Sequence, residues 1–423
     1  MTETIPDSKG GQFTIDAGPE SFITRKPEVW ELASEMGILD RVVNPGSETR
    51  NMYVLKGGKP IEIPLSPVKF IRSTLMTGRG KLRMLQEPFI PPKRDGEDES
   101  LAEFVTRRLG REALDEFIGP VLAGIYNTNP DTQSILTTSP VMREMEMEHG
   151  GLFKGALGRM RAARRVKKVE NGQPRPPRFI TFQNGAEELV EALVARLEGD
   201  LRLRVEIERI CPFGEQYEIL LKAGQRIFAD AIIFATPANV TNRLIENFAQ
   251  EAAKCMATIR HENIGTISLV YQSKDVQRVQ PIHGLMIPRR EKRKIDALTW
   301  TSNKMPSRAP AGYSLIRVFF GGNAPYMAEY NDSDLLNNVR AELRELLGIR
   351  AIPLDYRVQR WPKSFPQADV GHLDLVNTIE GALPAGLYVA GSSYRGIGVP
   401  DCIRQGRDAA QKAIESCRLK VAG

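Results

Sequence analysis

The residues most suited to chemistry form a glycine-rich loop close to the carboxyl end of the chain. An apolar strand is predicted over residues 387–390, and Gly391, Gly396 and Gly398 follow it before Pro400, where a helix would begin. Because glycine has no Cβ, the backbone there can approach a flat ligand closely. The start of the helix adds unpaired N–H groups and a partial positive charge, which stabilise an anion. The pattern predicts a ligand site, although a simple tight turn would use the same residue types.

Other familiar catalytic arrangements are missing from the sequence. The four cysteines are scattered without a C-x-x-C pair, and no histidine stands at the spacing of a metal ligand. No Ser/His/Asp or Cys/His set is recognisable. We therefore predict reduced thiols and no metal site, and we name no catalytic residue.

The overall composition is that of a globular protein with two or three domains. Hydrophobic residues make up 41% of the 423 residues and charged residues 26%, and the formal net charge is +6. This mildly basic balance suits an acidic ligand or an anionic membrane surface and does not indicate nucleic acid. Charge-free stretches are too short for a spanning helix of about 20 residues. We expect a cytoplasmic protein with at most peripheral membrane contact, and we predict no oligomeric state.

A more specific pattern is spread over five segments in order along the chain. They are residues 16–22 (DAGPESF), 122–126 (LAGIY), 234–238 (FATPA), 361–372 (WPKSFPQADVGH) and 391–403 (ending GIGVPDCI). These segments resemble motifs of the flavin-dependent protoporphyrinogen oxidases, within the flavin amine-oxidoreductase superfamily. The resemblance implies FAD as cofactor, protoporphyrinogen IX as substrate, protoporphyrin IX as product and oxygen as electron acceptor. Two alternatives stay open: a carotenoid desaturase or amine oxidase, and a flavin-free remnant that binds porphyrin.

The same resemblance implies roles for single residues. The positions that would contact the cofactor are Gly18, Pro19, Glu20, Ser21, Ile207, Trp361, Gly391, Ile397, Gly398 and Val399. Arg50 would hold a substrate propionate, because its planar guanidinium pairs with a carboxylate through two parallel hydrogen bonds. Met286, Leu298 and Phe319 would enclose the tetrapyrrole; without the resemblance, all three would be assigned to the core of a sheet.

One departure from the family pattern bears on the cofactor. Family members open with a strand, a G-x-G-x-x-G turn, a helix and a second strand, and this unit binds the ADP half of FAD. In this sequence Gly78-x-Gly80 and Gly396-x-Gly398 match the first three positions of this motif. Its sixth position, a glycine in the family, is occupied by Arg83 and Asp401. Either Met1 is a misassigned start, or the chain is a fragment, or the protein has abandoned FAD. We favour the first two, and whether this chain binds FAD stays open.

The elements that must position these residues follow from periodicity and turn signals. We expect a capping box from Ser100 to Glu103 and a helix capped by Asn184. Apolar residues alternate with charged ones over residues 201–207, which predicts a half-buried strand. The unbroken apolar run at 231–235 predicts a parallel strand covered on both faces. Further predicted elements are a strand at 12–16, a helix at 27–37, a hairpin at 53–63, an antiparallel sheet at 261–322 and a helix at 333–347.

The predicted fold combines α/β and α+β parts. A Rossmann-like FAD-binding domain, incomplete at its amino end, would comprise residues 1–50, 179–250 and 376–423. An antiparallel-sheet substrate domain would comprise residues 51–63 and 251–375 and be interleaved with it. The helical segment at 64–178 would either lie on a membrane surface or form a wall of the substrate channel.

Overall fold

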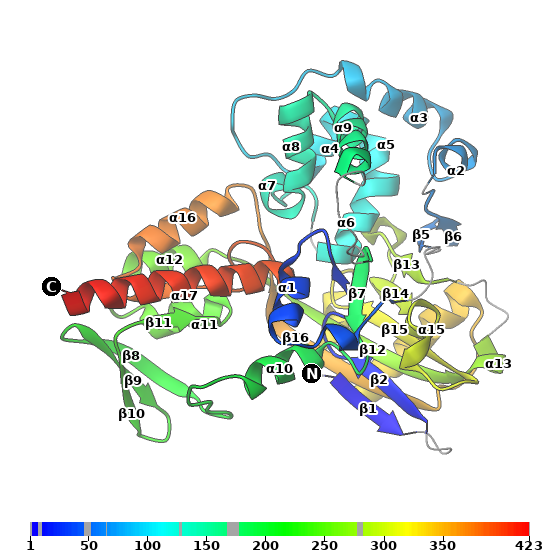
Figure 1. Cartoon of the computed structure of the whole chain (residues 1–423). Coiled ribbons are helices and arrows are strands. Elements are labelled where there is room, and N and C mark those ends of the chain that lie inside the picture. The colour runs from blue at the N-terminus through cyan, green and yellow to red at the C-terminus, as the bar shows by residue number, and fades with distance from the viewer. Residues whose placement is uncertain are drawn as a thin grey trace.

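The computed structural model describes residues 2–6, 11–45, 52–64, 66–126, 129–166, 177–276 and 282–422. Figure 1 shows a helical body above a large sheet, with a second lobe of helices and short strands beside them. Arg50 lies outside the described residues. Within the described part, no helix has the length and apolar character needed to cross a membrane.

The large sheet has seven strands in the order β16-β12-β15-β14-β13-β5-β6. All neighbours are antiparallel except β13 and β5, so the antiparallel sheet predicted from residues 261–322 is confirmed with one parallel addition. The helix α15 packs on one face through Leu335, Val339 and Leu343. The strands are β5 (Met52–Lys56), β6 (Lys59–Glu62), β12 (His261–Gln272), β13 (Gly284–Met286), β14 (Ala297–Trp300), β15 (Tyr313–Phe320) and β16 (Asp355–Pro366), and α15 is Asp332–Leu347.

The helical body is stabilised by an apolar core and by buried ion pairs. Ser100 and Glu103 form the predicted capping box at the start of α4. Arg108 and Glu146 are both fully buried and carry opposite charges. Either charge would be costly to bury alone, and the other compensates part of that cost. The helices are α2 (Pro67–Arg72), α3 (Gly78–Leu85), α4 (Leu101–Leu109), α5 (Arg111–Ala113), α6 (Gly119–Tyr126), α7 (Ile135–Thr138), α8 (Pro140–His149) and α9 (Leu152–Val166).

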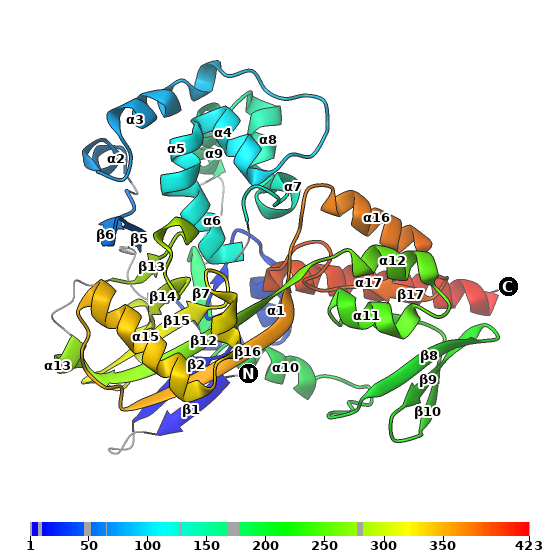
Figure 2. The ribbon, with the colours of Figure 1, turned by 180° about the vertical axis from the view of Figure 1, so that it is seen from behind.

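The second lobe joins a middle segment of the chain to its carboxyl-terminal part. Its short parallel pair, β11 (Ile232–Phe234) with β17 (Leu387–Val389), packs against α11 (Ala238–Ile245), α12 (Gln250–Ala257) and α16 (His372–Ala382). The meander β8-β9-β10 projects from this lobe, as Figure 2 shows from behind. The remaining elements are β1 (Thr2–Pro6), β2 (Gln12–Asp16), β3 (Phe22–Ile23), α1 (Glu28–Glu35), β4 (Val42–Val43), β7 (Phe179–Phe182), α10 (Glu187–Ala195), β8 (Ile207–Phe213), β9 (Gln216–Leu221), β10 (Arg226–Ala229), α13 (Ser273–Val276), α14 (Thr301–Lys304) and α17 (Val399–Ala422).

Two local predictions are wrong and a third is confirmed only in part, each for a physical reason. The helix α10 begins after Ala186, and the Asn184 side chain bonds to Glu188 in place of the helix backbone. The alternating segment 201–206 forms no strand, because it has no neighbouring strand in the described structure, and β8 begins only at Ile207. The run at 231–235 does contain a parallel strand, but Ile233 is 39% exposed, so one face is uncovered.

Candidate active site

The turn that follows β2 is clamped to the large sheet by one arginine. The guanidinium of Arg317, on β15, donates to the carbonyl oxygens of Ala17 (2.7 Å) and Gly18 (2.8 Å). The Arg317 side chain is 4% exposed, so these charge-assisted bonds are shielded from water. The two main-chain segments are therefore fixed relative to each other at the point where the glycine turn meets the sheet.

Glu20, in the same turn, is the centre of a buried charge cluster. Its carboxylate lies 3.3 Å from Arg317 and 3.5 Å from Lys304, and Thr301 donates a hydrogen bond to it at 3.2 Å. Burial alone would raise the pKa of Glu20, but the positive charges of Lys304 and Arg317 and their hydrogen bonds lower the pKa overall. Glu20 is therefore an anion that anchors the turn. No local pattern in the sequence indicates the partners of Glu20.

A second buried arginine supports the strand that leads into the turn. Arg308 pairs with Asp16 at 3.1 Å and donates to the Thr181 hydroxyl (3.0 Å) and the Phe182 carbonyl (3.2 Å). The Thr181 hydroxyl in turn donates to the carbonyl of Glu20 at 2.7 Å. Both arginines are functional candidates that the sequence analysis missed, because each lies far along the chain from the turn that it supports.

The carboxyl-terminal loop is connected to the same region. Gly391 and Gly396 have φ values of 118° and 117°, which residues with a Cβ rarely adopt, so the predicted need for glycine holds at these two positions. Asp401, at the start of α17, pairs with Lys26 at 2.6 Å, close after the amino-terminal turn in sequence. Val399 packs with Phe22 in one apolar cluster. These contacts join the elements that carry the two glycine turns.

Of the residues predicted to enclose the substrate, two share a face of the sheet and one does not. In the strand register Met286 is opposite Ala297, and Ala297 is opposite Phe319. Phe319 lies two positions after Arg317, so its side chain is on the same face, and its ring lies 5.0 Å from the guanidinium. Leu298 pairs with Leu285 and Val318 and is buried beneath α15. Neighbouring residues of a strand point to opposite faces, so Leu298 lies on the other face from Phe319, and its contact with the substrate stays a prediction.

Two other predicted cofactor residues lie on exposed positions. Ile207 is 41% exposed at the start of β8, and Trp361 is 40% exposed on the edge strand β16. Pro19 is exposed, while Gly18, Ser21, Ile397 and Gly398 are half-buried. Their contacts with a cofactor stay predictions, as does the role of Arg50.

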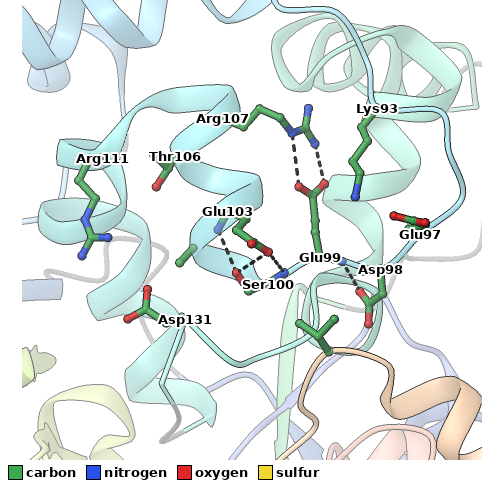
Figure 3. A pocket seen from close by; sticks show the side chains of 12 residues that line it. Lys93, Glu97, Asp98, Glu99, Ser100, Glu103, Thr106, Arg107, Arg111 and Asp131 are labelled. Atoms are coloured by element: carbon green, nitrogen blue, oxygen red, sulfur yellow. Dashed lines mark hydrogen bonds and ion pairs between the residues drawn. The ribbon is translucent and has the colours of Figure 1, made fainter.

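A large hollow of about 980 Å³ lies elsewhere, between the helical body and Val370. Figure 3 shows that charged side chains line it, among them Glu99, Glu103 and Arg107. Arg107 donates to Glu99 at 2.6 Å, and Glu103 accepts from the Ser100 backbone within the capping box. Glu99, Glu103 and Arg107 are thus partnered within the protein, and none of the predicted site residues lines the hollow.

Comparison with known proteins gives this arrangement a family. The model of the flavin containing amine oxidoreductases matches residues 3–414. The chain belongs to this family. The resemblance inferred from five short segments is thereby confirmed, and the flavin amine oxidoreductase is assigned FAD as its cofactor and oxidation–reduction as its chemistry.

Curated relatives cover almost the whole flavin amine oxidoreductase chain. Coproporphyrinogen III oxidase of Staphylococcus aureus is 30% identical over 95% of this chain and 89% of its own length. Protoporphyrinogen oxidase 2 of Arabidopsis thaliana is 25% identical over 95% of this chain and 85% of its own length. A solved structure from Exiguobacterium sp. 255-15, named for protoporphyrinogen oxidase, covers the whole chain with a TM-score of 0.81 at 24% identity. That likeness supports the fold.

The residues of this flavin amine oxidoreductase fit one half of FAD. The backbone at Gly18 has open space where a Cβ would stand, and the glycine turns at 17–18 and 391–398 belong to elements in contact. For the half that carries ADP, the sequence contains no G-x-G-x-x-G turn that would approach the pyrophosphate. The two glycine turns are therefore compatible with the ring side of FAD, and their contact with it stays a prediction.

Proposed function

We propose that this protein takes part in the FAD-dependent oxidation of a porphyrinogen to a porphyrin in haem biosynthesis. The supporting observation is the position of Phe319 and Met286 on the sheet face that also carries Arg317. An apolar surface suited to a flat macrocycle thus continues into the turn that a flavin would face. The names of the curated relatives favour the same reaction class.

Two porphyrinogens are candidates for the substrate. The resemblance of the motifs favoured protoporphyrinogen IX, with protoporphyrin IX as the product. The relatives at 30% and 27% identity are named for coproporphyrinogen III, which makes that substrate the second candidate. Coproporphyrinogen III carries more propionates, so a site that prefers it would need more cationic contacts. We propose Arg50 as one of them.

The chemistry divides between the cofactor and the chain. Bound FAD would supply the acceptor for a hydride from a saturated bridging carbon of the porphyrinogen. The chain would position the macrocycle between Phe319 and Met286, and Arg317 with Glu20 would hold the turn at a fixed distance from it. Oxygen is the proposed final acceptor.

A direct assay tests this proposal. The purified chain is supplied with FAD and with freshly reduced coproporphyrinogen III or protoporphyrinogen IX, and porphyrin fluorescence is followed above the spontaneous rate. We expect a Phe319→Ala variant to lower kcat/KM, whereas Leu354→Ala, at an exposed position, leaves it unchanged. Turnover of an amine or a polyene in place of porphyrinogens would favour the alternative members of the family. A colourless protein that binds porphyrin without oxidising it would refute catalysis by this chain.

We also propose a cytoplasmic location with peripheral membrane contact through α2, α3 and the turn after them. Ile71 (72% exposed), Leu85 (63%) and Phe89 (86%) face outward there, and Lys69 and Lys81 lie in the same helices. Sedimentation with anionic vesicles should fall for Phe89→Glu and stay unchanged for Ile352→Glu, which lies at an exposed position outside this segment.

A further inference from the structure

The outer face of the meander β8-β9-β10, which projects from the second lobe in Figure 2, carries two exposed aromatic rings. In the strand register Phe213 is opposite Gln216 on β9. Phe228 is opposite Glu218, two positions further along β9, so both rings lie on one face. Tyr217, between these positions, points the other way into the core of the lobe. Phe213 and Phe228 are 59% and 47% exposed with ring centroids 5.1 Å apart, which makes them a candidate contact surface.

The strand β10, which carries Phe228, forms one edge of the meander. It pairs with β9 on one side without a bulge, and on the other side with no strand among the described residues. The Leu221 amide of β9 donates to the carbonyl of Gln225, directly before β10. Because hydrogen bonds alternate between the two edges of a strand, the peptide groups of Arg226 and Phe228 point to the free edge. A regular edge strand without proline offers these groups to another strand.

The charges along β10 make this edge complementary to itself. Arg226 stands two residues before Phe228 and Asp230 two residues after it. The Arg226 side chain is 65% exposed and lies 3.1 Å from Glu218, and exposed Asp230 accepts from Gln216 at 2.9 Å, so both charges are on the outer face. In an antiparallel pair of two β10 strands centred on Phe228, each Arg226 stands opposite Asp230 of the second copy. Centring the pair on Arg226 or on Asp230 would place like charges opposite each other, which is destabilising.

We infer that β10 is a dimerisation edge, at which two copies of this chain pair their β10 strands antiparallel about a two-fold axis at Phe228. The peptide groups of the two Phe228 residues exchange hydrogen bonds at the axis, and the exposed rings of both copies come together there. An Arg226–Asp230 pair on each side of the axis specifies the register. One short edge buries little area, so we expect a dimer in the weak, micromolar class. The inference does not rest on the proposed function, because no predicted site residue lies in β10.

Sedimentation equilibrium of the full chain across the micromolar range tests the dimerisation edge. We expect a monomer–dimer equilibrium that Phe228→Glu abolishes. Arg226→Glu and Asp230→Lys should each weaken the dimer about tenfold, because each places like charges opposite one another on both sides of the axis. The exposed-site control Ile352→Glu, outside the meander, should leave the equilibrium unchanged. Hydrogen exchange of the Arg226 and Phe228 amides should slow as the concentration of the parent chain rises.

Mixing the two charge variants separates strand pairing from a purely structural role of these residues. Arg226→Glu carries two acids on the edge and Asp230→Lys carries two bases, so a mixed dimer places opposite charges together at both pairs. Fluorescence-detected sedimentation of a labelled trace of one variant against the other should show a mixed dimer about tenfold tighter than either variant forms alone. If Arg226→Glu does not fold beside Glu218, Arg226→Gln takes its place and should still bind Asp230→Lys more tightly than Asp230→Lys binds itself.

Three results would overturn the inference. The first is a parent chain that stays monomeric throughout the micromolar range. The second is a dimer that persists unchanged in Phe228→Glu, which would place the interface on another surface. The third is a mixture of folded charge variants that associates no more tightly than the variants do alone.

Discussion

Replacing Arg317 with methionine tests whether the buried charge cluster fixes the turn. Methionine keeps much of the apolar stem but removes the donors to Ala17 and Gly18 and the ion pair with Glu20. Both side chains are nearly buried, at 4% and 7% exposure. Removing one partner of such a pair costs about 3–5 kcal/mol of folding free energy, because the other charge stays buried. Lys304 still neutralises Glu20 in part, so we expect the lower end of this range, about 3 kcal/mol.

The loss of folding free energy in Arg317→Met should depend on pH, in a direction that follows from the pKa of Glu20. The pKa of Glu20 is lowered below 4.5 in the folded protein, so its contribution to stability is present at neutral pH and is lost as the pH falls through that lowered value. Without Arg317 the effect of burial weighs more, and the pKa of Glu20 rises. The stability gap between the variant and the parent protein should therefore narrow as the pH falls below 4.5 toward that lowered value.

The assay is urea unfolding followed by tryptophan fluorescence at about pH 7.5 and about pH 3.5, on either side of the unfolded pKa of Glu20. Glu20→Gln and the double variant complete a mutant cycle. We expect a coupling energy of about 1–3 kcal/mol between the two positions at the higher pH. Phe319→Leu serves as a control for lost packing on the same sheet face. Two results together would refute the reasoning. They are a stability difference between Arg317→Met and the parent protein below about 1 kcal/mol that does not change with pH, and additive effects of the two substitutions.

Three further changes have expected outcomes. Leu298→Ala should lower the free energy of unfolding by about 2–5 kcal/mol in chemical denaturation, because it opens a cavity beneath α15; a neutral result would contradict the burial of Leu298. Gly396→Ala should cost about 1–3 kcal/mol by the same measurement, since φ is 117° and a Cβ would lie 2.8 Å from the Asp401 carboxyl carbon, and an unchanged unfolding midpoint would count against the strained turn. Burial raises the pKa of Asp296 from 3.8 to about 6, although the backbone hydrogen bonds from Asn323 and Gly322 oppose this shift. The free energy of unfolding should therefore decline by about 3 kcal/mol as the pH rises through this interval. Melting temperatures measured between about pH 4 and about pH 7 should change less with pH in Asp296→Asn than in the parent protein.

Local signals in the sequence predicted local structure well. Ser100 and Glu103 specify a helix start through contacts three residues apart, and the two glycines at 57–58 specify the hairpin of β5 and β6. Gly391 and Gly396 were predicted for their backbone freedom, and both have positive φ. Such features depend on neighbours in the chain, so the sequence alone reveals them.

The sequence did not reveal features that depend on interactions between distant segments. The face to which Leu298 points depends on the register of β14 with β13 and β15, which no local pattern specifies. Residues 201–206 have the alternation of a strand, but a strand forms only where another strand is available. Arg317 and the Ala17 carbonyl are 300 positions apart, so the arginine that clamps the turn resembles any charged residue of a sheet until the fold is known.

The ion pair between Lys26 and Asp401 joins residues 375 positions apart, and this has a consequence for the newborn protein. Translation releases the amino-terminal turn early, whereas the residues that complete its surroundings follow only about 375 positions later. Until α17 has emerged, Phe22 cannot pack with Val399, and Lys26 cannot form its ion pair with Asp401. Assembly of this region therefore waits until α17 has been synthesised, and chains that end before α17 should lack it.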